Sequence, residues 1–414
     1  MLSMAMALSL VGCGNWELPG SQALFIYIQH GAGSNSNATS KSADEDLELQ
    51  MLLQDLIARY RHKNPKARIH VRSFAPDDLG PEMRLRQSSG LGPDLVISDV
   101  QVAFELHDQG LTTPVRIPAE RLNNIAAPVI RRFEENGALL ALPFSLQPQI
   151  ACFNRRRIAE PPQSLQQLLE LAARGHRVGL PIQIRDLAWT ASGLAAAEQP
   201  LLLAAIQADR IPGTQEREAH RALGDWINWI RMASLQQYVA FADSNDDLYT
   251  QFLEGQLDWI PCRSLKAKLL QHKLGSQFGA SPLPGRAPNQ PAAATVKLLT
   301  WSFGHHSSEM QQQLAKDFAL FSLNEVNQKE LMLKTQTSLP INTQVMVPSK
   351  SSQLLAAMVI GLDNGILLDF NRRMLMLNNG AGKLQTLVRQ AVLGETITNH
   401  FKPTPAKPGR RANP

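Results

Sequence analysis

Apolar and polar positions in the first hundred residues predict a β-α-β-α-β series. The run ALFIYIQ at Ala23–Gln29 and the run DLVIS in Gly92–Asp99 are typical of buried strands. Between them, Arg68–Phe74 alternates like a half-buried strand, and leucines at helical spacing follow Ser42 until Asn64-Pro65. Strands that alternate with helices favour a parallel, doubly wound sheet.

A second series of strands and helices begins at Ala141–Arg155. It continues through the helical stretch His220–Leu235 and the segment Phe252–Cys262. The Pro- and Gly-rich run Ser281–Pro291 is typical of a segment that crosses between domains. A chain of 414 residues, 44% of them hydrophobic, can bury two cores, so we expect two domains.

The N-terminus has the pattern of an export signal. Residues 1–12 carry no charge and are too few to span a bilayer, but they suit the apolar core of a signal peptide. Leu10-Val11-Gly12-Cys13 then resembles a bacterial lipobox, in which the cysteine thiol receives lipid. The alternative is a buried cysteine in an apolar helix. We expect Cys13 to anchor an otherwise soluble chain to the membrane.

Composition and motifs argue against several other functions. The formal charge is +5, and no Lys/Arg run is interleaved with aromatic residues as nucleic-acid binding requires. Neither a phosphate-binding loop nor a G-x-S-x-G motif occurs, and no cluster completes a metal shell around His305-His306. The sequence therefore predicts a binding protein without catalytic activity, cofactor or metal.

Several polar residues follow predicted strands, where open α/β sheets bind their ligands. The candidates are Gln29 and His30 after the first strand, Asp99 at the end of DLVIS, Ser145 and Gln147 in the second series, and Arg263 after a later strand. An N-cap of the next helix is an equally good interpretation of Asp99.

Tryptophans could supply the apolar part of such a site, because indole rings stack on the faces of pyranoses. Trp189, Trp259 and Trp301 lie at predicted strand or loop ends and are ligand candidates, with burial in the core as the alternative. The two other cysteines, Cys152 and Cys262, lie in predicted strands. Two buried, unpaired thiols are the first interpretation, and a disulfide is the alternative if the Cα atoms lie within about 7 Å.

Read in order, several segments resemble family 1 of the extracellular solute-binding proteins of ABC importers, the group that contains maltose-binding protein. The segments are RYRHKNPKARIHVRSF, GLGPDLVISD, LHDQGLTTPV, ALPFSLQPQIACFNR, YTQFLEGQLDWIPC, FGASPLPGR and TWSFGHHSSEMQQQLAKDFALFSLNEVNQKELMLKTQTSLPIN. The resemblance runs through most of the chain, and the order and spacing of the segments carry it. Trp301 departs from the pattern, because many relatives have a Gly-Gly pair with an aromatic residue there.

The resemblance implies an α/β, two-lobed periplasmic-binding-protein-like fold (type II) whose chain crosses between the lobes three times at a hinge. The expected parts are 1–22 (signal peptide and tether), 23–142 with 283–321 (N-terminal lobe), 143–282 with 322–401 (C-terminal lobe) and 402–414 (disordered tail). It also implies a monomeric periplasmic lipoprotein that closes on a sugar or polyol and delivers it to a permease with a separate ATPase.

Other functions stay open at this point. The same fold could bind a polyamine, a phosphate ester or iron. An iron site would want a cluster of tyrosines, and the presence of only four in the chain argues against it. A lipid-anchored hydrolase would need two carboxylates facing each other at about 5–10 Å, with Asp186 and Asp258 as candidates. A sensor that hands its closed form to a signalling partner is a third alternative.

Overall fold

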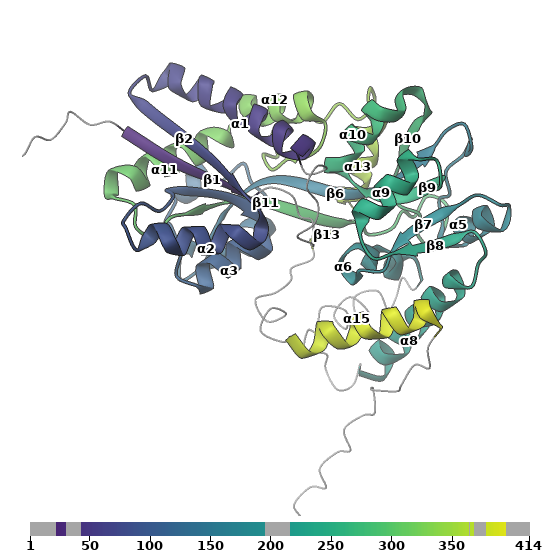
Figure 1. Ribbon diagram of the computed structural model, residues 1–414. Coiled ribbons are helices and arrows are strands. Elements are labelled where there is room, and N and C mark those ends of the chain that lie inside the picture. The colour runs from purple at the N-terminus through teal and green to yellow at the C-terminus, as the bar shows by residue number, and fades with distance from the viewer. Residues whose placement is uncertain (1–21, 30–42, 195–215, 364, 368–377, 395–414) are drawn as a thin grey trace, which may run out of the picture.

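The structure, a computed structural model, describes residues 22–29, 43–194, 216–363, 365–367 and 378–394. It is an α/β protein with two lobes joined by strands that run through both (Figure 1). The strand order of the main sheet is β2-β1-β3-β11-β6-β9-β7-β8. The predicted fold class is confirmed.

The first lobe combines a parallel series with two strands from later in the chain. Its strands are β1 (Gln22–Gln29), β2 (Ala67–Phe74), β3 (Leu95–Asp99), the first half of β6 (Leu142–Asn154) and β11 (Thr295–Phe303). β1 pairs in parallel with β2 and β3, whereas β11 is antiparallel and lies between β3 and β6. On one face pack α1 (Ala43–Lys63), α11 (Glu309–Ser322) and α12 (Glu325–Thr335), and on the other α2 (Pro76–Gln87) and α3 (Val100–Asp108).

The second lobe covers both faces of its strands with helices. Its strands are the second half of β6, β7 (Val178–Pro181), β8 (Val239–Ala242), β9 (Trp259–Arg263) and β10 (Phe278–Ser281). One core includes α5 (Leu165–Ala173), α6 (Ile184–Leu187), α8 (Glu216–Ser234) and α15 (Asn378–Leu393). Helices α9 (Asn245–Leu253), α10 (Ser264–Leu274) and α13 (Gln353–Asp363) belong to the other core. The short elements are α4 (Ala127–Ile130), β4 (Glu134–Glu135), β5 (Ala138–Leu139), β12 (Leu339–Pro340), β13 (Ile366–Leu367) and the 3-10 helices Ala119–Arg121, Ala188–Gly193 and Gly275–Gln277.

Strand β6 links the lobes. Its residues 142–148 pair with β11, and residues 149–153 pair with β9. The backbone hydrogen bonds of one continuous strand therefore hold both lobes at the junction between them.

Helix α12 belongs with the first lobe, so the predicted boundary after Phe321 is wrong by one helix. Lys334 pairs with Asp55 of α1 at 2.6 Å, and Glu330 pairs with Arg59 of the same helix. A helical pattern shows which face of a helix is apolar but not which lobe receives that face, and this limit explains the error.

Cys152 and Cys262 form a disulfide between β6 and β9, so the interpretation as unpaired thiols is wrong. The register sets Ile150 opposite Cys262 and Cys152 opposite Ile260, which brings the two cysteines diagonally together with Cα atoms 5.8 Å apart. Such a diagonal pair depends on the antiparallel register, which the sequence does not reveal.

Candidate functional site

Polar side chains from both lobes meet where the lobes join. We call them the junction cluster: Gln29, Gln101, Gln147, Gln149, Arg185, Asp186, Asn245, Asp99, Arg263 and Lys297. Gln29, Asp99 and Arg263 are the last residues of β1, β3 and β9, so three strands point their carboxyl ends at this region. Part of this cluster therefore lies at the strand ends that the sequence predicts as the binding region.

Asp99 is both the N-cap of α3 and a member of the junction cluster. Its Oδ1 accepts a hydrogen bond from the Val102 N–H at 3.0 Å, which stabilises the first turn of α3. Its Oδ2 accepts from Gln29 Nε2 at 3.3 Å and lies 3.3 Å from the Lys297 ammonium. Both interpretations of Asp99 from the sequence are thus compatible.

Lys297 was missed in the sequence, because it lies inside β11 rather than at a strand end. In the antiparallel register, Lys297 stands opposite Gln147 of β6. Gln149, also of β6, stands opposite Arg263 of β9. Opposed residues in antiparallel strands share a face, and so do residues two apart. One face of the sheet therefore presents Gln147, Gln149, Lys297 and Arg263 together. Ser145, two residues before Gln147, is fully buried, and its hydroxyl has no hydrogen-bond partner among the described residues.

Asp186 holds the second lobe's half of the cluster together. Its Oδ1 accepts from Arg263 Nη2 at 2.7 Å and Nε at 3.2 Å, and its Oδ2 accepts from Asn245 Nδ2 at 2.7 Å. Gln149 Nε2 donates to the Asp186 carbonyl at 2.9 Å. The Arg263 guanidinium is thus fixed by charge-assisted hydrogen bonds rather than left to sample rotamers.

A side-chain hydrogen bond also joins the two lobes directly. Arg185 of α6 donates to Gln101 Oε1 of α3. The second lobe's side chains therefore reach the helix that Asp99 caps in the first lobe.

The charges in the cluster shift one another's titration. Burial alone would raise the pKa of Asp99, but the Lys297 ammonium and the Val102 N–H favour the ionised form and hold the pKa below its usual value. Burial lowers the pKa of Lys297, and the Asp99 carboxylate offsets only part of this effect. Asp99 is thus a persistent hydrogen-bond acceptor at neutral pH.

The three tryptophans predicted to contact a ligand lie in the cores instead. The Trp301 ring packs edge-on against Phe144 and Phe318 at 5.3 and 5.9 Å, and its Nε1 donates to Ser322 Oγ at 3.0 Å. In the sheet it stands between Ile97 of β3 and Leu142 of β6.

Trp189 and Trp259 are also fully buried, with ring centroids 6.1 Å apart in the second lobe's core. Trp259 opens β9, so it lies at the amino end of that strand, whereas the cluster lies at the carboxyl end. The prediction that these three rings stack on a solute is therefore wrong. His30 and Cys13 lie outside the described residues.

The two carboxylates considered for hydrolysis do not face each other. Asp258 precedes β9 and accepts from the Arg177 N–H at 2.9 Å, whereas Asp186 is bound to Arg263 at the far end of the same strand. A five-residue strand separates such ends by on the order of 15 Å. This arrangement does not fit a pair of glycosidase carboxylates.

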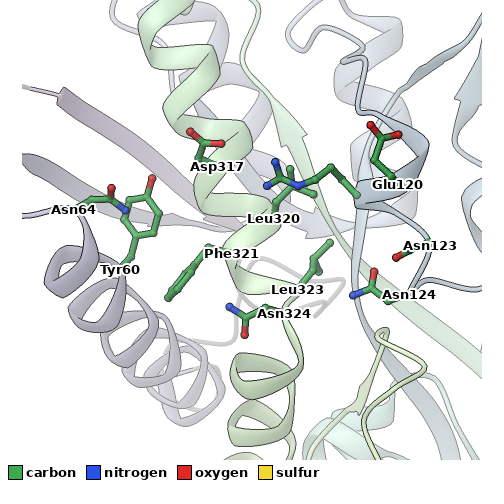
Figure 2. A pocket seen from close by; sticks show the side chains of 11 residues that line it. Tyr60, Asn64, Glu120, Asn123, Asn124, Asp317, Leu320, Phe321, Leu323 and Asn324 are labelled. Carbon is green, nitrogen blue, oxygen red and sulfur yellow. The ribbon is translucent and has the colours of Figure 1, made fainter.

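A separate pocket of about 510 Å³ lies on the first lobe (Figure 2). Its lining comes from the ends of α1 and α11 and from the turn after Pro118, and consists of Tyr60, Asn64, Glu120, Arg121, Asn123, Asn124, Asp317, Leu320, Phe321, Leu323 and Asn324. None of these residues belongs to the junction cluster. Because the junction cluster unites side chains of both lobes, whereas the lining of this pocket comes from the first lobe, the cluster is the candidate site for a ligand that both lobes enclose.

Across the described residues, no helix is both long and apolar enough to cross a bilayer, and no three His, Cys, Asp or Glu side chains gather as metal ligands.

Comparison with curated proteins gives no match. The fold is similar to that of the GacH receptor of Streptomyces glaucescens, solved unliganded and with acarbose. The TM-score is 0.67 at 12% identity, over 91% of this chain and 94% of that chain.

Two further solved structures are similar. The cyclic α-maltosyl-1,6-maltose-binding protein of Arthrobacter globiformis has a TM-score of 0.66 at 16% identity, over 91% of this chain and 95% of that one. The maltose-binding protein MalE of Listeria monocytogenes, in complex with maltose, has a TM-score of 0.65 at 14% identity, over 90% of this chain and 92% of that one. At such identities the likeness establishes the fold alone. The family model of the bacterial extracellular solute-binding proteins matches residues 55–357, well over half of the sequence, and the chain belongs to this family.

Proposed function

We propose that the chain is the receptor of an ABC importer and binds a sugar or sugar-like polyol at the junction cluster. The observation that carries the proposal is the meeting of charged and amide side chains from both lobes around Asp99 and Lys297. The sugar class comes from the solved relatives, whose names refer to maltose, acarbose and related saccharides.

The chemistry of the cluster suits hydroxyl groups, each of which donates one hydrogen bond and accepts others. Asp99 and Asp186 are acceptors, and Lys297 and Arg263 are donors. The amide groups of Gln29, Gln147 and Gln149 supply both functions. Because the tryptophans are in the cores, recognition by the described residues rests on polar contacts more than on ring stacking.

The mechanism is binding coupled to closure, without chemistry on the solute. A ligand that contacts both lobes binds the closed form more tightly than the open form and shifts the population toward it. Asp99 and Lys297 act from the first lobe's sheet, and Arg185 and Arg263 from the second lobe. The closed receptor then docks on the permease, whose separate ATPase subunit drives transport. Lipid at Cys13 would keep the receptor beside that permease.

A thermal-shift screen tests the ligand class. Sugars and polyols that bind only the native state should raise the melting temperature, whereas polyamines and phosphate esters should not. Asp99→Asn should weaken the binding of any hit by about tenfold to a hundredfold, because a charged acceptor makes the stronger hydrogen bond. Glu160→Gln, an exposed carboxylate outside the cluster, is the matched control.

The outcomes separate the alternatives. Stabilisation by a non-sugar solute that Asp99→Asn abolishes would keep the site and change the ligand class. A sugar that binds the Asp99→Asn and Arg263→Gln variants like the original chain would exclude the junction cluster. Turnover of a sugar that disappears with Asp186→Asn would show an enzyme instead.

A further inference from the structure

The chain carries a strongly basic stretch that the binding function does not use. Between Asp55 and Asp77 the sequence has six Lys and Arg residues and no acidic one. Two of the six are neutralised by other elements, since Arg59 pairs with Glu330 and Arg72 lies 3.7 Å from Glu82. The remaining four lie between these two.

These four cations and a histidine form one exposed turn at the end of α1. We call it the basic turn: Arg61, His62, Lys63, Lys66 and Arg68, all exposed. The chain reverses tightly here, because the Asn64 N–H donates to the Tyr60 carbonyl at 2.8 Å and the Ala67 N–H to the Asn64 carbonyl at 2.9 Å.

The basic turn has no internal counter-charge. Arg61 donates to the Ile69 carbonyl at 2.9 Å, and Lys63 lies over the Phe321 ring at 5.3 Å, but among the described residues no carboxylate pairs with any member of the turn. The dipole of α1 favours cations in its last turn. It does not account for Lys66 and Arg68, which follow the helix. Glu120 and Asp317 line the pocket beside Asn64, but among the described residues neither carboxylate forms an ion pair with the basic turn.

The topology sets the basic turn beside the start of β1. In the parallel pair, Gln22 stands opposite Ala67 and Ala23 opposite Arg68, and Figure 1 shows the start of β1 next to the turn from α1 into β2. Eight residues lie between Cys13 and Gln22, and the nine steps from Cα to Cα span at most about 30 Å. A lipid at Cys13 would hold this end of the lobe close to a bilayer, whereas Gln29 of the junction cluster lies at the opposite end of β1.

We propose that the basic turn is a docking surface for anionic phospholipid headgroups and forms a second attachment to the membrane. Its orientation toward the bilayer rests on the proposed lipid at Cys13, but its affinity for headgroups does not. Each arginine or lysine side chain near an anionic surface strengthens binding about fivefold. This effect falls off within a Debye length, which is roughly 10 Å at moderate salt. A polybasic contact of this kind adds to the membrane affinity that a lipid anchor supplies.

Vesicle binding by the full chain carrying Cys13→Ser, which removes lipid as a variable, tests the surface. The protein should bind vesicles of equal parts phosphatidylglycerol and phosphatidylcholine, and the binding should weaken as salt rises; it should not bind pure phosphatidylcholine. Lys66→Gln/Arg68→Gln should weaken the binding by about 25-fold. The control Arg174→Gln/Lys350→Gln removes the same charge from exposed positions elsewhere and should change it little.

Three outcomes would overturn the proposal. These are equal binding to both kinds of vesicle, no binding to either, and an equal loss in the two double variants. Impaired uptake by Lys66→Gln/Arg68→Gln cells without vesicle binding would instead assign the basic turn to an acidic protein surface. A sugar should raise the melting temperature of Lys66→Gln/Arg68→Gln as much as that of the original chain. A failure of sugar binding is therefore measured separately from a failure of vesicle binding.

Discussion

Asp99 illustrates why single residues of the site were only partly predictable. Its place at the end of an apolar run identified it, as it identified Gln29 and Arg263, because strand ends can be read from local pattern. Lys297 and Asp186 gave no such signal, since each depends on pairings between segments far apart in the chain. The tryptophans were misplaced because an aromatic side chain suits a core as well as a ligand face.

The lowered pKa of Asp99 predicts an acid sensitivity. The folded pKa lies below the unfolded value of 3.8, so ionised Asp99 stabilises the fold at higher pH, and this stabilisation is lost as pH falls through the folded pKa. Between about pH 5 and pH 3, the original chain should lose more free energy of unfolding than Asp99→Asn. Urea titrations at several pH values measure the difference, and parallel pH curves for the two proteins would contradict it.

Trp301 should matter for stability rather than for binding. Trp301→Ala removes a ring packed between Phe144 and Phe318 and should lower the free energy of unfolding by about 3–5 kcal/mol. Trp301→Phe should fold and keep the solute affinity of the original chain, measured by calorimetric titration. A folded Trp301→Phe protein that cannot bind would return the ring to the ligand site.

At the scale of elements, local pattern predicted β1 and β2 to within one residue and β3 to within three, and Asn64-Pro65 does follow the end of α1. The insertion of β11 between β3 and β6 had no local signature. Its neighbours are chosen by side-chain packing across strands that the sequence separates widely. For the same reason α12 was given to the wrong lobe.

The disulfide between β6 and β9 should stabilise the second lobe. It joins residues 110 positions apart, so it strongly restricts the unfolded chain. Cys152→Ser/Cys262→Ser should lower the free energy of unfolding by about 2–5 kcal/mol in urea. Adding a reductant should destabilise the original chain to a similar extent and leave the double variant unchanged. An equal effect of reductant on both proteins would contradict this prediction.

At the scale of the whole molecule, the lobes should unfold together. β6 pairs with β11 in one half and with β9 in the other, so neither lobe can lose its sheet without disturbing the strand that both share. Scanning calorimetry should show one transition whose calorimetric and van't Hoff enthalpies agree. Two resolved transitions, or a van't Hoff enthalpy well below the calorimetric one, would show that the lobes are independent.

The central position of β11 means that the sheet of the first lobe is completed late, after most of the chain has been made. A chain that emerges from its N-terminus presents β1, β2 and β3 long before β11, and until then the buried strand β3 has one unpaired edge. Such an edge can pair with another chain, which is a route to aggregation. Chains that end before Thr295 should therefore depend on holding chaperones more than chains that extend beyond Phe303, and should aggregate more readily without them.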